Sequence, residues 1–328
     1  MRSFVIPIEN YSGGVQWVED PELGYRMEEN QLNNFSNGYF NVEVRTNDKG
    51  FRDEYNASYG NPGIIAIGDS YTFGHGIEAE DTWPEQLQNK IKLNVVNLGV
   101  SGYAPWQYEY VIRRIHQTKQ PVKVVLYAMS WNDAIADQRF EITEEPNSEI
   151  RKRLENKDAV VFLKKNALYE IMLNKTAIGV LLQQSARKIL SSMAFKTTEQ
   201  QDRTMIAHLE STKEILQNLS KYLENLGARL IIVHIGTVNF VMTDRWKDYS
   251  RRHNFSRYVV RDTFAPWADL NGIQFRDALG DLENRYLSSG KRRTSIFLPV
   301  DNHYNKYGNE EISKIFYEIL NEEMGLGM

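Results

Sequence analysis

The chain has 328 residues, with 39 basic and 43 acidic side chains and no cysteine, which gives a formal net charge of −4. The lack of cysteine excludes disulfides, thiolate metal sites, iron–sulfur clusters and a cysteine nucleophile. The mildly acidic charge argues against general nucleic-acid binding, which needs a strongly basic face. If the chemistry is nucleophilic, we therefore expect the attacking atom to be a hydroxyl oxygen.

Residues 1–60 are polar and rich in glycine and other turn-forming residues. Short alternating pieces such as 39–44 predict small strands in this part of the chain. Its aromatic residues, among them Trp17 and Phe51, need cover from water. We therefore expect an N-terminal extension that packs on a main domain spanning 61–328.

From residue 63 onward, short apolar runs alternate with helical stretches. The runs are rich in Ile and Val and do not alternate with polar residues, which is typical of strands buried on both faces of a parallel sheet. The expected strands are 63–67, 94–98, 123–129, 229–235 and, more weakly, 272–276. The expected helices are 82–92, 104–117, 203–226 and 306–322. This alternation predicts an α/β domain, in which ligands bind at the carboxyl ends of the strands.

A long segment, about 136–200, separates the third and fourth expected strands and is too long for a plain loop. Its apolar stretches predict a helical insertion. The part 151–191 holds nine basic and three acidic residues, a net charge of +6, so the rest of the chain carries −10. The insertion either covers the site or contacts an anionic membrane surface or acidic polysaccharide, or it has a charged face that is merely solvated. We favour the solvated face.

Polar residues follow each of the first three expected strands, with glycines beside them after the first two. Ser70 lies in the turn after the first strand, where its hydroxyl can face the crevice. Gly99 and Gly102 follow the second strand and allow a backbone N–H to face an oxyanion. Asn132 follows the third strand and can add a side-chain N–H donor. Each residue also has an ordinary structural interpretation, as part of a turn or as a helix cap.

A loop directly before the last expected helix carries Asp301 and His303. Histidine is the usual general base for a hydroxyl nucleophile, and a carboxylate on its other nitrogen sets its tautomer and orientation. The two residues are close enough in sequence for a loop to bring both side chains to one side. A nucleophile, a base, an orienting carboxylate and oxyanion donors together make an acyl-transfer site.

The sequence at these positions resembles the SGNH hydrolases, also called the GDSL family. Four sequence blocks of that family are matched in order along the chain: Gly68-Asp69-Ser70, 97–102, 130–133 and 301–303. The segment 50–53, Gly-Phe-Arg-Asp, also resembles a bacterial subgroup of the family. The chain departs from the family pattern at Tyr71, where Leu is usual, and at Ser130, where Gly is usual. The Asp also precedes the His by two residues rather than the commoner three.

The resemblance implies Ser70 as the nucleophile, His303 as its base and Asp301 as the carboxylate that orients His303. It also implies an oxyanion hole formed by the backbone N–H groups of Ser70 and Gly102 and by the side chain of Asn132. The implied fold is a three-layer α/β/α sandwich around a flavodoxin-like parallel sheet of five strands.

We therefore expect a serine esterase that forms an acyl-enzyme on Ser70. Its substrate would be an O-acyl or O-acetyl ester of a carbohydrate, or a small lipid-like ester. The alternative is an O-acyltransferase that passes the acyl group to a glycan hydroxyl with the same triad. A third hypothesis is a non-catalytic binding protein that keeps the fold. We expect no nucleic-acid partner.

The other acidic residues and histidines that could take part in chemistry are interpreted mainly as structural. Asp69 and Asp133 are expected to hold backbone turns, and His234 could line the pocket from the end of the fourth strand. The remaining histidines are expected to be packing or surface residues: His75, His116, His208 and His253. With no cysteine and no clustered histidines in the sequence, we expect no metal site and no cofactor.

No apolar run approaches the roughly 18 residues that a membrane-spanning helix needs. The N-terminus carries one basic residue, Arg2, but no apolar stretch of the kind found in signal peptides. We expect a cytoplasmic protein, or an exported or anchored one if a further segment precedes this sequence.

Overall fold

A computed structural model describes residues 12–53, 63–91, 93–116, 122–131, 133, 198–250 and 255–324. The segment 134–197, which contains nearly all of the expected helical insertion, lies outside these residues. The interpretations of the basic 151–191 stretch therefore remain predictions.

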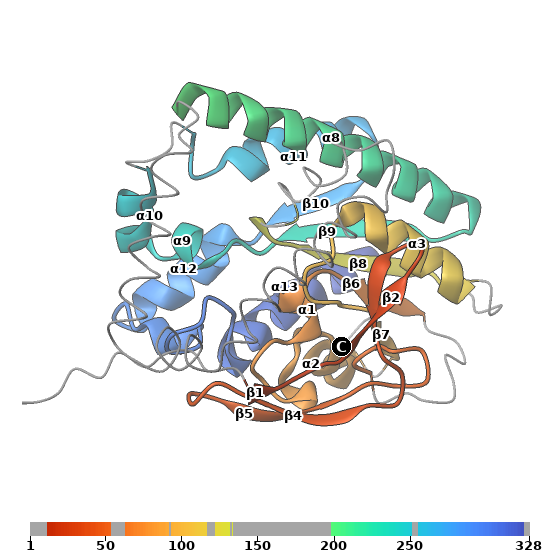
Figure 1. Cartoon of the computed structure of the whole chain (residues 1–328). Coiled ribbons are helices and arrows are strands. Elements are labelled where there is room, and N and C mark those ends of the chain that lie inside the picture. The colour runs from red at the N-terminus through yellow and green to blue at the C-terminus, as the bar shows by residue number, and fades with distance from the viewer. Residues whose placement is uncertain are drawn as a thin grey trace, which may run out of the picture.

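The centre of the fold is a parallel sheet of five strands in the order β10-β9-β8-β6-β7 (Figure 1). In chain order these strands are β6 (Ile64–Ile67), β7 (Val95–Asn97), β8 (Val124–Met129), β9 (Arg229–His234) and β10 (Gln274–Asp277). The first of them, β6, pairs with both β7 and β8, so the chain winds outward from it in two directions. This is the flavodoxin-like order, and it confirms the expected sheet.

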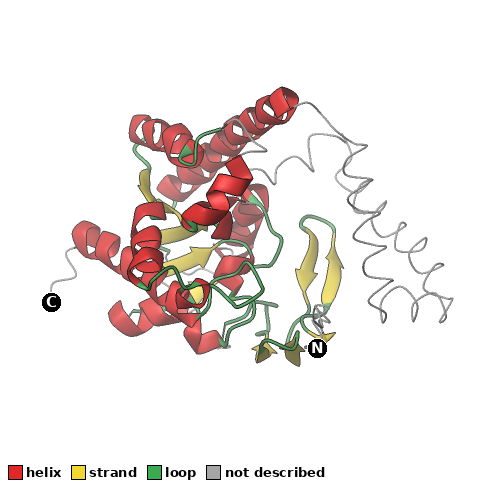
Figure 2. Cartoon of the chain, turned by 90° about the vertical axis from the view of Figure 1, so that its left-hand side faces the viewer, coloured by secondary structure: helices red, strands yellow, loops and turns green. Residues whose placement is uncertain are grey.

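Helices cover both faces of this sheet and make three layers (Figures 1 and 2). One face carries α3 (Pro105–His116), α8 (Thr198–Asn225) and α11 (Val259–Leu270). The other carries α2 (Trp83–Ile91) and α13 (Lys306–Met324). Because both faces are covered, every residue of β6 and β8 is buried. This explains why apolar and polar residues do not alternate along the sequences of these strands. The α/β/α sandwich is as expected.

Further helices occupy the connections that leave the carboxyl ends of the strands. They are α1 (Ser70–Phe73), η1 (Ala79–Asp81), α9 (Val238–Val241), α10 (Thr243–Ser250), α12 (Leu279–Ser288) and η3 (Arg293–Ser295). These connections meet at one edge of the sheet, so residues far apart in the sequence can combine there into a site.

The N-terminal residues form two small antiparallel sheets outside the α/β sandwich. One contains β1 (Ser12–Gly13), β4 (Leu32–Ser36) and β5 (Asn41–Arg45), and the other is the hairpin of β2 (Trp17–Asp20) and β3 (Gly24–Met27). Leu23, Met27, Val42 and Val44 belong to the same apolar core cluster as the central sheet. The extension therefore shares the hydrophobic core of the main domain. The boundary expected near residue 60 stays a prediction, because 54–62 lie outside the described residues.

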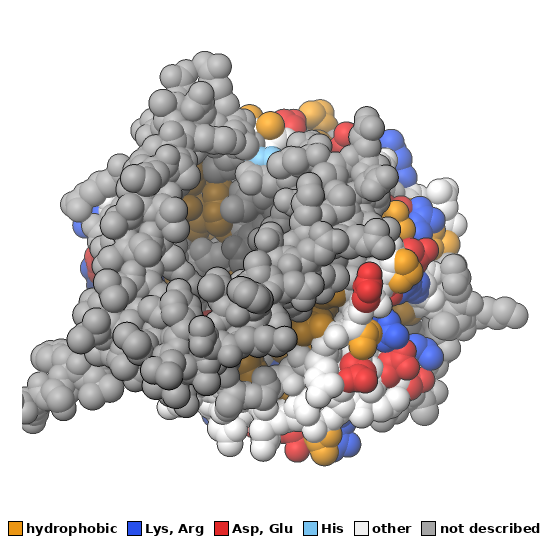
Figure 3. Space-filling model, viewed as in Figure 1, with side chains coloured by type: hydrophobic (Ala, Val, Ile, Leu, Met, Phe, Trp, Pro, Cys, Tyr) orange, Lys and Arg blue, Asp and Glu red, His pale blue; other side chains and the backbone are white. Residues whose placement is uncertain are grey.

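Basic and acidic side chains lie intermixed on the described part of the surface that faces the viewer in Figure 3. In the part of the chain that the structure describes, no helix combines the length and the apolar character needed to cross a membrane.

Candidate active site

Ser70 lies at the point where the first strand of the sheet turns into a helix. Gly68 has a positive φ of 151°, and a Cβ atom there would lie 2.1 Å from Thr72 Oγ1, so a larger residue does not fit this turn. The Asp69 carboxylate then caps the short helix α1 by accepting the N–H of Tyr71 at 3.0 Å. Ser70 is the first residue of that helix, at the carboxyl end of β6.

His303 links Ser70 to Asp301. Its Nε2 atom lies 2.7 Å from Ser70 Oγ, and its Nδ1 atom is hydrogen-bonded to Asp301 Oδ1. The backbone N–H of His303 donates to the same carboxylate oxygen at 2.9 Å. These partners assign the tautomer in which Nδ1–H donates to Asp301 and Nε2 accepts from the Ser70 hydroxyl. The structure thus brings together the three residues that the sequence motifs selected.

The Asp301 carboxyl lies in an environment that keeps it ionised. Burial alone would raise its pKa, but the hydrogen bonds from His303 and the nearby ring of His75 outweigh this effect and hold the pKa well below its usual range. A carboxylate at this position stabilises the positive charge that His303 acquires when it takes a proton.

Side chains from outside the loop hold the segment that carries Asp301. Arg293 donates to the backbone carbonyl of Asp301 and, at 2.9 Å, to that of Leu298. The hydroxyl of Tyr71 donates to the carbonyl of Asn302 at 3.1 Å. Tyr71 departs from the family pattern, and this contact gives the departure a structural role: the residue after Ser70 ties α1 to the loop of the base.

Gly102 lies in the loop after β7, which is tied to α1. The Asn97 side chain donates to the Thr72 carbonyl at 3.1 Å and accepts the N–H of Gly99 at 2.9 Å. Gly102 itself has a positive φ of 80°, which favours glycine. The loop expected to supply an oxyanion donor is therefore anchored to the helix that carries the nucleophile.

The third strand end is anchored through Ser130. Its backbone N–H donates to Asp133 at 2.9 Å, and its hydroxyl donates to Asp69 at 3.0 Å. Both carboxylates hold backbone turns, as expected, and Ser130 connects them. Burial and the charge of Asp69 raise the pKa of Asp133. Asn132 lies outside the described residues, so its role as an oxyanion donor stays a prediction.

His75 is the residue that the sequence interpretation missed. It was expected to be a packing or surface residue, yet its ring stacks on that of His303, with centroids 4.2 Å apart and planes inclined by 24°. Its Nε2 atom lies 3.5 Å from Asp301 Oδ2. The available signal was its position in the turn directly after α1, five residues beyond Ser70.

His234, by contrast, is buried at the end of a sheet strand. It ends β9 with 1% of its side chain exposed, and its Nδ1 atom lies 2.8 Å from Asp277 Oδ1 at the end of β10. The contact joins two neighbouring strand ends, and we assign His234 a structural role.

His75, Asp301 and His303 also each offer one atom that could bind a metal, all within 4.8 Å of one another. However, Ser70 and Asp301 already engage both ring nitrogens of His303. A metal bound through His303 would have to displace one of these partners. The contacts in this cluster therefore favour a hydroxyl nucleophile activated by His303.

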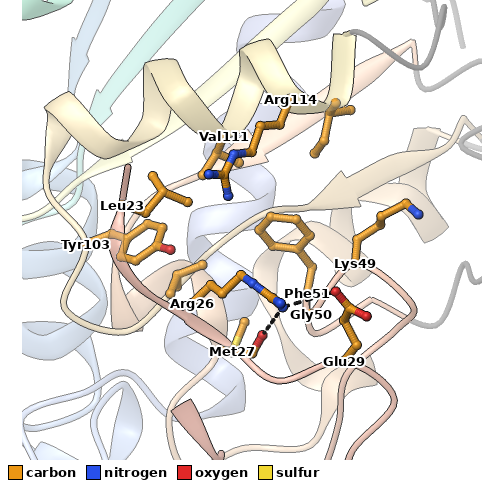
Figure 4. A pocket seen from close by; sticks show the side chains of 12 residues that line it. Leu23, Arg26, Met27, Glu29, Lys49, Gly50, Phe51, Tyr103, Val111 and Arg114 are labelled. Carbon is orange, nitrogen blue, oxygen red and sulfur yellow. Dashed lines mark hydrogen bonds and ion pairs between the residues drawn. The ribbon is translucent and has the colours of Figure 1, made fainter. Parts of the chain in front are cut away.

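A separate cavity of about 250 Å³ lies between the β2–β3 hairpin, the loop around Gly50 and helix α3 (Figure 4). Its lining is mainly apolar, and its two arginines are paired within the protein: Arg26 lies 3.1 Å from Glu29, and Arg114 lies 2.7 Å from Asp20. No member of the triad lines this cavity. It marks the junction between the N-terminal extension and the sandwich.

No protein-family model matches the chain, and no curated protein matches it. Among solved structures, the acetyl xylan esterase AlAXEase is 11% identical, with 78% of this chain and 98% of that chain covered and a TM-score of 0.47. The psychrotrophic esterase EstA from Pseudoalteromonas sp. is 12% identical, with 80% and 100% covered and a TM-score of 0.43. LAE5, an α/β hydrolase enzyme from the metagenome of Lake Arreo, is 15% identical, with 83% and 100% covered and a TM-score of 0.44.

Proposed function

We propose that this chain is a serine esterase of the SGNH hydrolase type, with Ser70 as its nucleophile. The contact that carries the proposal is the 2.7 Å distance between Ser70 Oγ and His303 Nε2, with Asp301 on the opposite ring nitrogen. An imidazole held in this way removes the hydroxyl proton as the oxygen attacks an acyl carbon.

Acylation starts when Ser70 Oγ attacks the ester carbonyl carbon and His303 Nε2 takes the hydroxyl proton. Asp301 stabilises the imidazolium, which then passes the proton to the departing alcohol oxygen as the ester C–O bond breaks. The products of this step are the free alcohol and an acyl-enzyme on Ser70. In the second step His303 deprotonates a water molecule, which attacks the acyl carbon, and the carboxylic acid leaves as the proton returns to Ser70.

The oxyanion formed in each step is proposed to accept hydrogen bonds from the N–H groups of Ser70 and Gly102 and from the side chain of Asn132. One such donor is typically worth about 10²- to 10³-fold in rate. The hydrogen bonds that tie the Gly102 loop to α1 support this assignment, because a preorganised donor needs a fixed backbone.

The proposed substrate is an O-acyl ester, such as an O-acetyl group on a carbohydrate, or a small lipid-like ester. Release of free acid in water, rather than transfer of the acyl group to an added sugar, distinguishes hydrolysis from the acyltransferase alternative. Both reactions use the same acyl-enzyme, so the acceptor alone separates them.

The test is hydrolysis of p-nitrophenyl acetate together with labelling by a fluorophosphonate probe. We expect the wild-type protein to hydrolyse the ester and to carry the label on Ser70 by peptide mass spectrometry. Ser70→Ala should abolish both signals with unchanged thermal unfolding, whereas the control Ser288→Ala, on the exposed end of α12, should keep both. Hydrolysis that survives in Ser70→Ala would contradict the proposal.

A further inference from the structure

The ring of His75 lies between the triad and the N-terminal sheet. It stacks on His303 at 4.2 Å, with its Nε2 atom 3.5 Å from Asp301 Oδ2. Phe35 and Phe40 also contact the ring, in T-shaped arrangements with centroids 5.0 and 5.7 Å away. Both phenylalanines come from the sheet of β1, β4 and β5 or its connecting turn. His75 is thus the point at which this sheet reaches the active-site cluster.

The turn that carries His75 is held by a buried arginine from the N-terminal extension. Arg52 is 3% exposed, and its guanidinium donates to three carbonyls of this turn: Phe73 at 3.2 Å, Gly74 at 2.6 Å and Ile77 at 2.7 Å. Burial lowers the pKa of Arg52 to about 10, so it remains charged at neutral pH. Charged donors make the stronger hydrogen bonds to backbone carbonyls, and these fix the conformation around His75.

Arg52 belongs to the segment 50–53. This segment resembles a bacterial subgroup of the family, but its sequence predicted no role for it. Asp53, the neighbour of Arg52, accepts the N–H of Asn97 at 2.8 Å, at the end of β7. One short segment of the extension therefore holds two connections that lead to the site: the turn after α1 and the loop after β7.

The two oxygens of the Asp301 carboxylate face different partners. Oδ1 accepts both hydrogen bonds from His303, while Oδ2 faces His75. Two donors from one residue hold only one oxygen, and a donor on the second oxygen stops the carboxylate from rotating. Burial lowers the pKa of His75, which makes its neutral form, with a proton on Nε2, the suitable donor.

We propose that His75 is a positioning residue, whose Nε2–H holds the second carboxylate oxygen of Asp301 so that Oδ1 stays aligned with His303. The N-terminal extension holds His75 in turn, through Arg52 and through Phe35 and Phe40. The inference rests on the proposed esterase function, because it concerns the carboxylate that orients the base of that reaction.

The test compares two variants with the wild-type protein in p-nitrophenyl acetate hydrolysis. His75→Phe keeps an aromatic ring between the phenylalanines and His303 but has no donor, whereas His75→Gln keeps an N–H group of similar reach. A hydrogen bond to a charged group corresponds to about a 10- to 100-fold effect. We expect His75→Phe to lower kcat by this factor with KM nearly unchanged, and His75→Gln to recover most of it.

The outcomes separate this inference from the proposed function. Wild-type kcat in folded His75→Phe, with inactive Ser70→Ala, overturns the role of His75 and leaves the esterase proposal standing. Equal losses of kcat in His75→Phe and His75→Gln also overturn it, because the donor would then not matter. If His75→Phe does not fold, His75→Gln is compared with His75→Met, because Met is nearly isosteric with Gln but has no N–H donor. A higher kcat for the Gln variant supports the proposal, and equal values overturn it.

Discussion

Ser70 Oγ and His303 Nε2 lie 2.7 Å apart, although 233 positions separate the two residues in the chain. The distance is that of a hydrogen bond, and it depends on two anchored segments: α1 at the end of β6, and the loop before α13. Tyr71 joins these segments directly through its hydrogen bond to the Asn302 carbonyl. The alignment of nucleophile and base is therefore built into the packing of the first and last parts of the sandwich.

The charge of Asp301 should be essential to turnover. Asp301→Asn removes the carboxylate and can offer an N–H group to His303 Nδ1, which favours the wrong tautomer. We expect kcat to fall by about 10³-fold or more, as such substitutions do in other serine hydrolases. The matched control is Asp281→Asn on α12, an exposed residue 3.3 Å from Arg276, which should keep wild-type kcat. A loss of less than tenfold in Asp301→Asn would contradict the proposed role.

Gly102 should be intolerant of a side chain for a reason beyond backbone strain. It has a φ of 80°, and a Cβ atom would lie 2.8 Å from the Tyr25 hydroxyl. Gly102→Ala should therefore shift the loop and its N–H, and lower kcat by about 10- to 10³-fold.

Gly227→Ala provides the matched control for this substitution. Gly227 has a similar φ of 72° after α8, but a Cβ atom there would meet nothing within 4 Å. It should carry the same strain, of order 1–2 kcal/mol of unfolding free energy, with wild-type kcat. Equal kcat values in Gly102→Ala and Gly227→Ala would contradict the proposed oxyanion role of the loop.

The buried His75 should make the folded state less stable as the pH falls. Burial, together with the neighbouring His303 and Arg52, lowers its pKa below the ordinary 6.5, although Asp301 opposes this shift. Below pH 6.5 the unfolded chain therefore binds a proton that the folded chain does not, so stability rises with pH from the folded-state pKa up to about 6.5.

His75→Phe removes this titration while leaving other groups in place. The difference in unfolding free energy between wild type and His75→Phe should therefore be larger at about pH 8 than at about pH 5. Urea unfolding at both values measures it. A difference that is independent of pH would show that His75 titrates alike in both states.

The strands could be predicted from the sequence because each is a local apolar run buried by its neighbours. The strand expected at 63–67 is Ile64–Ile67 in the structure, and the strand expected at 123–129 is Val124–Met129. The edge strand β10 gave a weaker pattern because all of its residues are only half-buried. Helix α8 begins at Thr198, whereas the sequence pattern placed its start at residue 203. The pattern missed the first turn because that turn is polar and carries no apolar periodicity.

The sequence by itself determined the available chemistry: without cysteine the nucleophile had to be sought among hydroxyl groups, and short motifs at strand ends selected Ser70, Asp301 and His303. Such motifs are readable because they are local. Only the tertiary structure decided that His75 faces the second oxygen of Asp301. That contact depends on the packing of an N-terminal sheet, a turn after α1 and a C-terminal loop, and no single stretch of sequence contains it.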